Sequence, residues 1–362
     1  MRNKKILVIC PYPKGVAAGQ RLKYEQHFKS WNDAGYEITV SSFFSNNTWD
    51  ILWKEGYTLH KIYGTFIGYL RRLKDLSKLH QFQSVYVFMW VTPLFDSIFE
   101  RLFLLKSNNL IYDFDDAIFL NETNIKGNIF RKYIKNNSKS KLLIKNSSHV
   151  ITSSPYNLEY CLDINKNNAA TYIPCSLDDK KFIPANNNAS SELRIGWTGT
   201  FTTKNYLDSI KHIIQKACMQ YDLKLVLITN FDYHIDGIKM QVIRWKEQTE
   251  IEDLQKIDIG LYPLIPSDWA LGKGGLKTLQ YMSIGIPSIS TNFGTATKIV
   301  TNKENGFLVN NDEEWLDAIE TLVNNKSLRD NLGRSAREHV IKNYSTDAVS
   351  KLYLDVLKRE LQ

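Results

Sequence analysis

The feature that most limits how this chain can fold is an alternation of short apolar runs with helical patterns, which occurs in both halves. The apolar runs that are typical of buried strands lie at 5–10, 36–44, 84–90, 109–116, 149–154, 193–200, 223–230, 241–245, 258–264 and 288–290. Helical patterns lie at about 61–80, 126–147, 205–221, 276–285 and 312–325, and from about Thr346 onward. Strands that alternate with helices predict an α/β fold, with mostly parallel sheets covered by helices on both faces.

A polar segment between the two series of strands marks a domain boundary. Residues 174–192 are rich in Asn and Ser and contain two prolines, which is typical of a linker. We predict two Rossmann-like, doubly wound domains over residues 1–174 and 193–344, and a closing helix over 345–362. Ligands bind outside the carboxyl ends of the strands in such sheets, so we expect the site in a cleft between the two domains.

The composition narrows the class of protein. Of the 362 residues, 43% are hydrophobic and 23% are charged, which is ordinary for globular domains. The four cysteines are scattered and form no CxxC pair, which argues against a zinc site or a disulfide framework and is typical of a reducing cytosol. No apolar run approaches the roughly 20 residues that a membrane span needs. We therefore expect a cytoplasmic protein.

A glycine-rich loop precedes the helical pattern at 276–285. Gly272, Gly274 and Gly275 lack the Cβ atoms that would keep a ligand away from the backbone, while Lys273 and Lys277 add positive charge. Unpaired amides and the dipole of a helix N-terminus attract phosphate groups. The loop therefore predicts a phosphate site, with a plain glycine turn and two solvated lysines as the alternative.

Two further glycine turns follow strand-like runs. Gly199 and Thr200 end "GWTGT" at 196–200, and Gly15 lies in "PYPKGVAAGQR" at 11–21. Together with the glycine-rich loop, the first turn predicts the two sides of a diphosphate clamp, and Gly15 could face that clamp from the first domain. Each turn is also compatible with a tight connection that binds nothing.

Three carboxylates lie at the end of the strand-like run at 109–116. Asp113, Asp115 and Asp116 belong to "DFDDAIF". At the carboxyl end of a strand they predict a group that binds acceptor hydroxyls or takes up a proton. The alternative is that Asp115 or Asp116 caps the N-terminus of a helix. No histidine or further carboxylate completes a set of metal ligands, so we expect no metal.

The chain is basic, with a net charge of +8, and this favours an anionic partner. None of the known DNA- or RNA-binding signatures occurs, so we predict no nucleic-acid partner. Two segments suit an anionic lipid surface or a lipid diphosphate: the aromatic and basic 61–79, and 130–146, which has no acidic residue. A solvated charged face is the alternative. The residues that we place on the acceptor or membrane side are Arg131, Lys135, Lys139 and Lys141.

Residues 258–309, with "GKGGLKTLQYMSIGIPSIS" and "NGFLV", resemble the retaining nucleotide-sugar glycosyltransferases of family 4, which have the GT-B fold. "GYEITVSS" at 35–42 matches a further family segment, and the "DFDDA" and "GKGGLKTLQYMS" patterns are closest to a bacterial branch found among surface-polysaccharide enzymes. The resemblance covers nearly the whole chain. It implies that the last helix crosses back to the N-terminal domain.

The resemblance also implies residue roles. The family has two glutamates separated by seven residues, of which the first contacts the donor sugar and the second bonds the ribose; these positions are Gly272 and Gln280 here. Lys277 matches a lysine with a role on the diphosphate. Trp245 and Lys246 fall where backbone atoms hold the base. The aspartates of "DFDD" take the place of an acceptor-side histidine.

The function implied is transfer of a sugar from a nucleotide diphosphate sugar to an acceptor hydroxyl with retention of configuration. Helix N-termini and lysines can stabilise the leaving diphosphate, so no cofactor and no metal are expected. The resemblance implies a glycan or lipid-linked glycan acceptor, and contact with the inner face of the cytoplasmic membrane. The alternatives are a sugar-nucleotide epimerase or a phosphorylase on the same fold, or a partner subunit that has lost turnover.

Overall fold

The computed structural model describes residues 4–94, 97–120, 138–185 and 192–360. The chain forms two compact units, each of which is described by itself. Unit 1 comprises Met1–Cys175, Gly272–Gly274 and Val349–Gln362, and unit 2 comprises Ser176–Leu271 and Gly275–Ala348. The three residues Gly272–Gly274 therefore group with unit 1, although they lie in the sequence of the second half.

Unit 1 contains a parallel six-stranded sheet with the strand order β2-β1-β3-β4-β5-β6. Its strands are β1 (Lys5–Cys10), β2 (Glu37–Ser42), β3 (Ser84–Phe88), β4 (Leu110–Phe114), β5 (His149–Thr152) and β6 (Ala170–Tyr172). Its described helices are α1 (Ala18–Lys23), α2 (Phe28–Asp33), α3 (Asn46–Leu52), α4 (Thr58–Lys78), α5 (Ile98–Lys106), α7 (Ser138–Asn146), α8 (Pro155–Ile164) and the greater part of α17 (Thr346–Glu360), with short 3₁₀ segments at Glu25–His27 and Leu79–Gln81.

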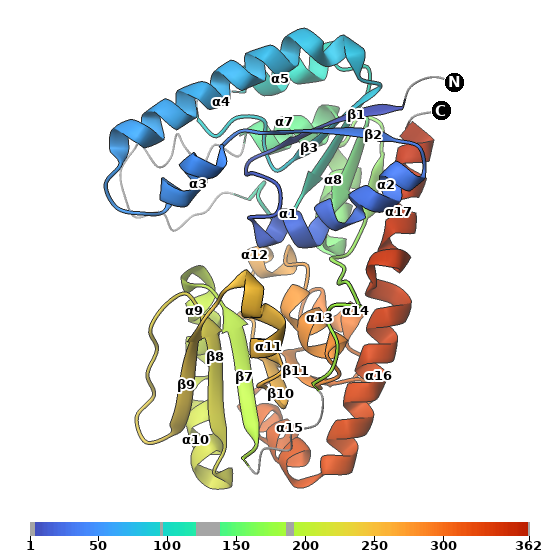
Figure 1. The fold of residues 1–362 in the computed structure, drawn as a ribbon. Coiled ribbons are helices and arrows are strands. Elements are labelled where there is room, and N and C mark those ends of the chain that lie inside the picture. Colours follow the sequence, from blue (N-terminus) through green and yellow to red (C-terminus); the bar gives the residue numbers. More distant parts are fainter. Residues whose placement is uncertain (1–3, 95–96, 121–137, 186–191, 361–362) are drawn as a thin grey trace. The chain divides into compact units, whose positions relative to one another are not determined.

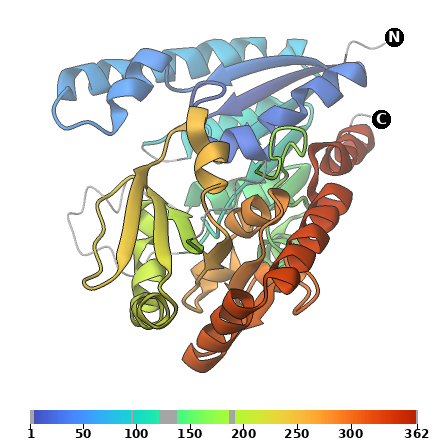
Figure 2. The same cartoon turned by 60° about the horizontal axis from the view of Figure 1, so that its bottom comes forward.

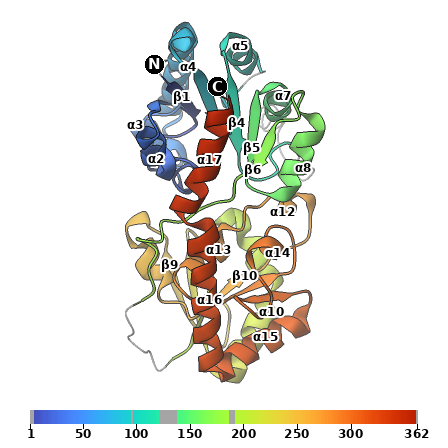
Figure 3. The same ribbon diagram turned by 90° about the vertical axis from the view of Figure 1, so that its right-hand side faces the viewer.

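Helices cover both faces of this sheet because its strands are apolar on both sides (Figures 1 and 2). Tyr24 and Trp31, from the α1–α2 region, share one core with Val349 and Tyr353 of α17. Figure 3 shows α17 running along the sheet of unit 1. Helices α4 and α5 lie on the opposite side of the sheet (Figure 1). The predicted packing of the last helix on the first domain is thus observed.

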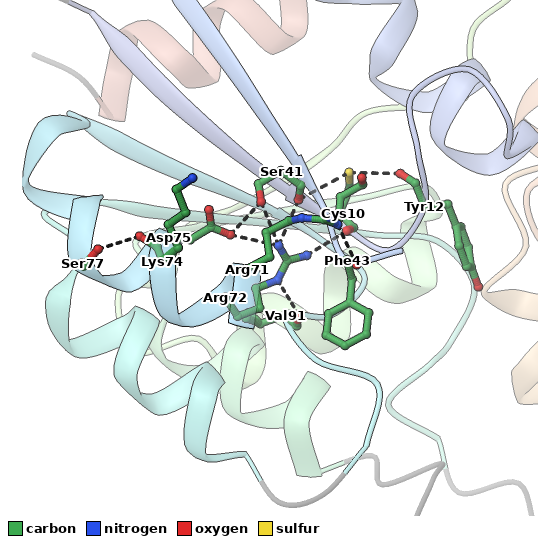
Figure 4. Close-up of polar contacts among 11 residues, drawn as sticks. Cys10, Tyr12, Ser41, Phe43, Arg71, Arg72, Lys74, Asp75, Ser77 and Val91 are labelled. Carbon is green, nitrogen blue, oxygen red and sulfur yellow. Dashed lines mark hydrogen bonds and ion pairs between the residues drawn. The ribbon is translucent and has the colours of Figure 1, made fainter. Parts of the chain in front are cut away.

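A buried arginine fastens α4 to the ends of two strands of unit 1 (Figure 4). Arg72 is completely buried, and its guanidinium donates to the carbonyl oxygens of Cys10 at 2.9 Å, Ser41 at 3.1 Å and Val91 at 2.8 Å. Asp75 neutralises it at 3.0 Å. The guanidinium thereby joins the ends of β1 and β2 to the segment after β3, and it adds a second donor to the Cys10 carbonyl, which also accepts from the Phe43 amide at 2.8 Å.

Unit 2 repeats the architecture, with a parallel sheet in the order β12-β11-β10-β7-β8-β9. Its strands are β7 (Arg194–Gly199), β8 (Lys224–Thr229), β9 (Lys239–Arg244), β10 (Ile259–Tyr262), β11 (Ser288–Thr291) and β12 (Phe307–Val309). Its described helices are α9 (Lys204–Ser209), α10 (Lys211–Tyr221), α11 (Glu250–Leu254), α12 (Asp268–Leu271), α13 (Leu276–Ser283), α14 (Ala296–Ile299), α15 (Asp312–Asn324) and α16 (Lys326–Tyr344), with 3₁₀ segments at Phe201–Thr203 and Glu247–Thr249.

The core of unit 2 places α13 closely on its sheet. Helices α10 and α15 bury Ile214 and Ile319 together with the strand residue Leu227. On the other face, a Cβ atom at Gly260 of β10 would lie 2.3 Å from the ring of Tyr281, so only glycine allows α13 to approach this strand. The hydroxyl of Tyr281 accepts a hydrogen bond from the Thr198 amide at 3.0 Å. This contact fixes α13 beside the end of β7.

The α/β architecture was predictable, but several elements differ from expectation. The sequence pattern did not predict β6, α3, α5 or α16, among others. The helix predicted over 205–221 is broken at Ile210 into α9 and α10. None of the helices in the described part of the chain is both long enough and apolar enough to cross a bilayer.

Candidate functional site

In unit 2, the carboxyl ends of β7, β8 and β9 lie at one edge of the sheet, since the strands are parallel neighbours. Gly199 is the last residue of β7, and Thr200 follows it at the start of the turn, as predicted. A Cβ atom at Gly199 would lie 2.1 Å from the Trp197 ring, so this glycine is required by packing. Thr200 and Thr203 form a reciprocal capping box. The turn is therefore held in one conformation at the sheet edge.

Lys277 lies beside the same turn. It occupies the first turn of α13, and its ammonium nitrogen is 5.3 Å from the centre of the Trp197 ring. The edge of that ring also abuts Gly199. A cation over an indole face is held by the ring quadrupole. Trp197 thus keeps the Lys277 charge next to the Gly199–Thr200 turn.

A carboxylate lies next to Gln280, although it comes from another element. The amide nitrogen of Gln280 donates to Oε1 of Glu250 at 3.0 Å, and both side chains are buried. Trp245, which follows β9, donates its indole N–H to the same oxygen at 3.3 Å. Gln280 and Lys277 are three residues apart on α13 and so lie on one side of it. An indole, a carboxylate, an amide and an ammonium group are therefore gathered at the carboxyl edge of this sheet.

Packing within the protein accounts for the three glycines of the loop before α13. Within unit 1, a Cβ atom at Gly272 would lie 2.5 Å from the Ala117 amide, and one at Gly274 would lie 3.1 Å from the Cys175 sulfur. In unit 2, Gly275 has a φ of +72° as the N-cap of α13, a conformation that favours glycine. Their role in binding phosphate stays a prediction.

The aspartates after β4 of unit 1 have different surroundings. Asp113 is fully buried, forms an ion pair with Lys23 at 3.1 Å and accepts hydrogen bonds from Tyr86 and Tyr353. Its partners hold it in the core, which indicates a structural role.

The next two aspartates lie in a turn. Asp116 has a φ of +47°, and its carboxylate is 3.5 Å from the ammonium group of Lys273 within unit 1. No helix starts at residues 115–120 of the described chain, so the capping alternative is not observed there. Asp115 is half-buried, and burial of its carboxyl raises its pKa to about 7, with the negative charges of Asp116 and Asp113 adding to the effect and Lys23 opposing it. A carboxyl group with such a pKa can exchange a proton near neutral pH.

The Gly15 loop is held by polar contacts inside unit 1. Gly15 has a φ of +85°, and its amide donates to the carboxylate of Glu25 at 2.8 Å. Gln20 bonds both backbone groups of Tyr12. The Gly15 amide is therefore already hydrogen-bonded, and the group beside it is the Glu25 carboxylate rather than a cation.

One residue of the predicted basic face is not on the surface. Lys139 is buried, its ammonium group donates to the carbonyl oxygens of Thr92 at 2.9 Å and Leu94 at 2.8 Å, and it lies 3.7 Å from Glu100. The prediction that Lys139 faces a membrane or an acceptor is therefore wrong, because this charge is used inside unit 1. Lys141 is exposed. Arg131 and Lys135 lie outside the described residues.

Sequence reasoning missed Glu250. Its position as the first residue of the short helix after Trp245 and Lys246 was a usable signal, because that helix starts at the sheet edge where the base was expected. Among the described residues, no group of three or more His, Cys, Asp or Glu side chains could hold a metal ion. The expectation of metal-independent chemistry stays a prediction.

Comparison with known proteins identifies the type of domain in the second half. Residues 180–339 match the family described as "Glycosyl transferases group 1". These residues include the Gly199 turn, Trp245, Glu250, Lys277 and Gln280. The prediction of a glycosyltransferase is confirmed at the level of this domain. No curated protein sequence matches the chain significantly.

Solved structures with similar folds span the whole chain. Sucrose-phosphate synthase from Thermosynechococcus elongatus aligns with a TM-score of 0.70 at 15% identity, covering 99% of each chain. HepE from Anabaena, in complex with UDP, aligns with a TM-score of 0.68 at 13% identity, covering 98% of this chain and 100% of that chain. A glycosyltransferase from Rickettsia africae aligns with a TM-score of 0.68 at 15% identity, covering both chains fully. These similarities confirm the predicted GT-B fold class.

Proposed function

We propose that the protein is a retaining glycosyltransferase, which moves a sugar from a nucleotide diphosphate sugar to a hydroxyl group of a glycan or lipid-linked glycan. The observation that carries this proposal is the cluster of Trp245, Glu250, Gln280 and Lys277 at one sheet edge of a glycosyltransferase group 1 domain. The binding of UDP by the similar Anabaena structure supports a nucleotide donor. The role in bacterial surface-polysaccharide synthesis rests on the resemblance of the sequence motifs.

The nucleoside would lie against Trp245, Glu250 and Gln280. The side chain of Trp245 is 37% exposed, so part of an aromatic surface is available next to a base. The Gln280 amide nitrogen is directed to Glu250, which leaves the amide oxygen as an acceptor for a ribose hydroxyl. Glu250 is a second acceptor in the same place. Replacement of the usual glutamate by Gln280 is therefore compatible with nucleotide binding.

The diphosphate would lie at Lys277 and the Gly199–Thr200 turn. In the transfer step, the bond from the sugar C1 to the diphosphate oxygen breaks and a bond from C1 to the acceptor oxygen forms. The acceptor proton passes to the departing phosphate, and the nucleoside diphosphate leaves. Lys277 would stabilise the negative charge that develops on this leaving group. No metal or further cofactor enters this scheme.

The acceptor would be bound by the turn of unit 1 that carries Asp115 and Asp116. Their carboxylates can accept hydrogen bonds from sugar hydroxyls, and Asp115 can hold a proton near neutral pH because burial raises its pKa to about 7. The ammonium group of Lys273 lies 3.5 Å from Asp116 and would orient that carboxylate. Contact with the inner face of the cytoplasmic membrane would bring a lipid-linked acceptor to this turn.

Titration calorimetry with UDP, GDP and TDP tests the donor site. We expect at least one nucleotide to bind, and Lys277→Ala to weaken that binding by about 1.5–3 kcal/mol, the scale of a hydrogen bond to a charged group. The matched control is Lys216→Ala, because Lys216 is an exposed lysine on α10. This variant should bind the nucleotide as tightly as the unmodified protein does. Equal affinity of the folded Lys277→Ala variant would contradict the assignment.

A further inference from the structure

Helix α4 of unit 1, whose course Figures 1 and 2 show, has an exposed apolar face along most of its length. Six large side chains on it are between 44% and 79% exposed: Leu59, Ile62, Tyr63, Phe66, Leu70 and Leu73. They recur at intervals of three and four residues and so lie on one face of the helix. We call these six residues the α4 stripe. Contiguous apolar surface of this kind marks an interaction site in soluble proteins.

The helix cannot turn to bury the stripe, because its other face is already fixed. A Cβ atom at Gly64 would lie 2.5 Å from the Thr48 hydroxyl, and one at Gly68 would lie 2.5 Å from the ring of Phe43. Arg72 and Leu76 continue this face at four-residue spacing and are buried. The stripe is therefore directed away from the core of unit 1.

The charges of α4 favour an anionic partner. The helix Thr58–Lys78 contains five basic residues and one acidic residue. The acidic residue, Asp75, accepts hydrogen bonds from Ser41 and Arg72 and so faces the core. Lys74 and Lys78 are exposed at the end of the stripe. The outward side of α4 thus combines apolar side chains with uncompensated positive charge.

Aromatic residues and a hollow border the stripe. Trp53 and Tyr57, just before α4, are 75% and 53% exposed. Trp and Tyr rings favour the boundary between headgroups and acyl chains. A hollow of about 340 Å³ between α3 and α4 is lined by Tyr63 of the stripe and by His60 and Arg71, which gives polar contacts at headgroup level.

We propose that α4 docks on an anionic lipid bilayer, lying parallel to it with the α4 stripe inserted among the headgroups and the upper acyl chains. An interfacial helix has this combination of a broad apolar face, aromatic residues and Lys or Arg. A second copy of the chain is a poorer occupant, because pairing of two identical stripes would bring the cations of both helices together. The proposal stands on unit 1 alone and does not depend on the donor site of unit 2.

Co-sedimentation with vesicles tests the proposal, in the absence of any nucleotide. We expect binding to phosphatidylglycerol-containing vesicles that exceeds binding to phosphatidylcholine vesicles. The double variant Phe66→Glu/Leu70→Glu should reduce binding about tenfold or more, because it removes two inserted side chains and adds repelling charge. Met219→Glu is the matched control: Met219 is 64% exposed on α10 of unit 2, and its replacement should leave binding unchanged.

Labelling locates the contact directly. The native cysteines are all buried and react slowly with labels. An environment-sensitive dye attached to Ile62→Cys therefore reports the polarity around α4. The same dye on Met219→Cys reports the polarity at the control position. We expect a blue shift with anionic vesicles only at residue 62. Unfolding curves must show that each variant is folded.

Three results would overturn the proposal. The first is that the protein does not bind vesicles at low salt, and the second is that Met219→Glu reduces vesicle binding as much as the double variant does. The third is that the unmodified protein is a dimer, that the double variant is a monomer, and that lipid has no effect on either. Calorimetry with nucleotides on the same double variant keeps the two proposals separate. Normal nucleotide affinity with lost vesicle binding supports α4 docking, whereas failure of nucleotide binding in the unmodified protein concerns only the proposed function.

Discussion

Glu250 and Gln280 share one buried hydrogen bond of 3.0 Å, although they lie on different helices of unit 2. Gln280→Glu would place two carboxylates at hydrogen-bond distance, and both cannot ionise at that separation without a large cost. We expect the variant to lose more stability, relative to the unmodified protein at the same pH, at pH 8 than at pH 5, where one proton can be shared. Thermal unfolding at the two pH values measures the effect.

Exchange of the two side chains provides the control. The double variant Glu250→Gln/Gln280→Glu again has one carboxylate and one amide. We therefore expect the double variant to be more stable than Gln280→Glu and close in stability to the unmodified protein. The interaction energy of two residues that share a hydrogen bond, as measured by a double-mutant cycle, is about 0.5–3 kcal/mol. If the exchange gives no recovery, the pair does not interact as the structure shows.

We expect Asp115 to make the stability of the protein depend on pH. Burial raises the pKa of its carboxyl to about 7, whereas an unfolded chain has a value of about 3.9. The folded state therefore holds a proton between these two pH values, and its stability falls as the pH rises through them. The destabilisation is complete above pH 7 and could reach about 4 kcal/mol.

Asp115→Asn removes this titration. The free energy of unfolding of the Asn variant, relative to the unmodified protein, should therefore increase between about pH 4 and about pH 7 and then level off. Urea denaturation at several pH values measures the difference. A difference that is independent of pH would mean that the Asp115 carboxyl is ionised throughout.

At the scale of elements, the attachment of α4 to the sheet depends on Arg72 (Figure 4). Arg72→Leu would leave Asp75 and the carbonyl groups of Cys10, Ser41 and Val91 without the guanidinium. Removal of one partner of a buried ion pair costs about 3–5 kcal/mol. We expect a loss of this size in urea denaturation, compared with less than about 0.5 kcal/mol for the exposed neighbour Lys74→Ala. A similar small loss for both variants would show that the network contributes little.

Elements with clear periodicity were predictable, and those without it were not. Buried strands such as β1 and β8 are continuous apolar runs. By contrast, β6 has three residues of intermediate burial, which gives no pattern to read. α16 is a long, mostly polar helix with few buried positions, so its apolar spacing is weak. The break at Ile210 leaves the helical pattern of 205–221 intact and is a matter of local backbone conformation.

The residues of the candidate site were predictable only where they belong to a recognisable sequence motif. Lys277 followed from the pattern around the glycine-rich loop, and Gln280 followed from the resemblance to the glycosyltransferase family. Glu250 did not, because its role depends on a contact with a residue 30 positions later in the chain. The burial of Lys139 likewise depends on Thr92, Leu94 and Glu100, which belong to a different part of unit 1.

At the scale of the whole molecule, two α/β units of similar design carry different chemical groups. Unit 2 gathers an indole, an amide, a carboxylate and an ammonium group at one sheet edge, which suits a nucleotide. Unit 1 has a turn with two carboxylates, and an exposed apolar helix with basic residues. This division agrees with a donor function in unit 2 and with acceptor and membrane functions in unit 1.

The central claim is that the protein transfers sugar from a nucleotide donor. Phosphorus NMR of UDP-, GDP-, TDP- and CMP-sugars, each incubated with the protein and a glycan-lipid extract, tests it most directly. The account predicts that one diphosphate donor is converted to its nucleoside diphosphate, that inorganic phosphate is not consumed, and that Lys277→Ala slows the conversion while Lys216→Ala does not. It would be contradicted if the folded protein left every donor unchanged, or if Lys277→Ala and Lys216→Ala behaved alike.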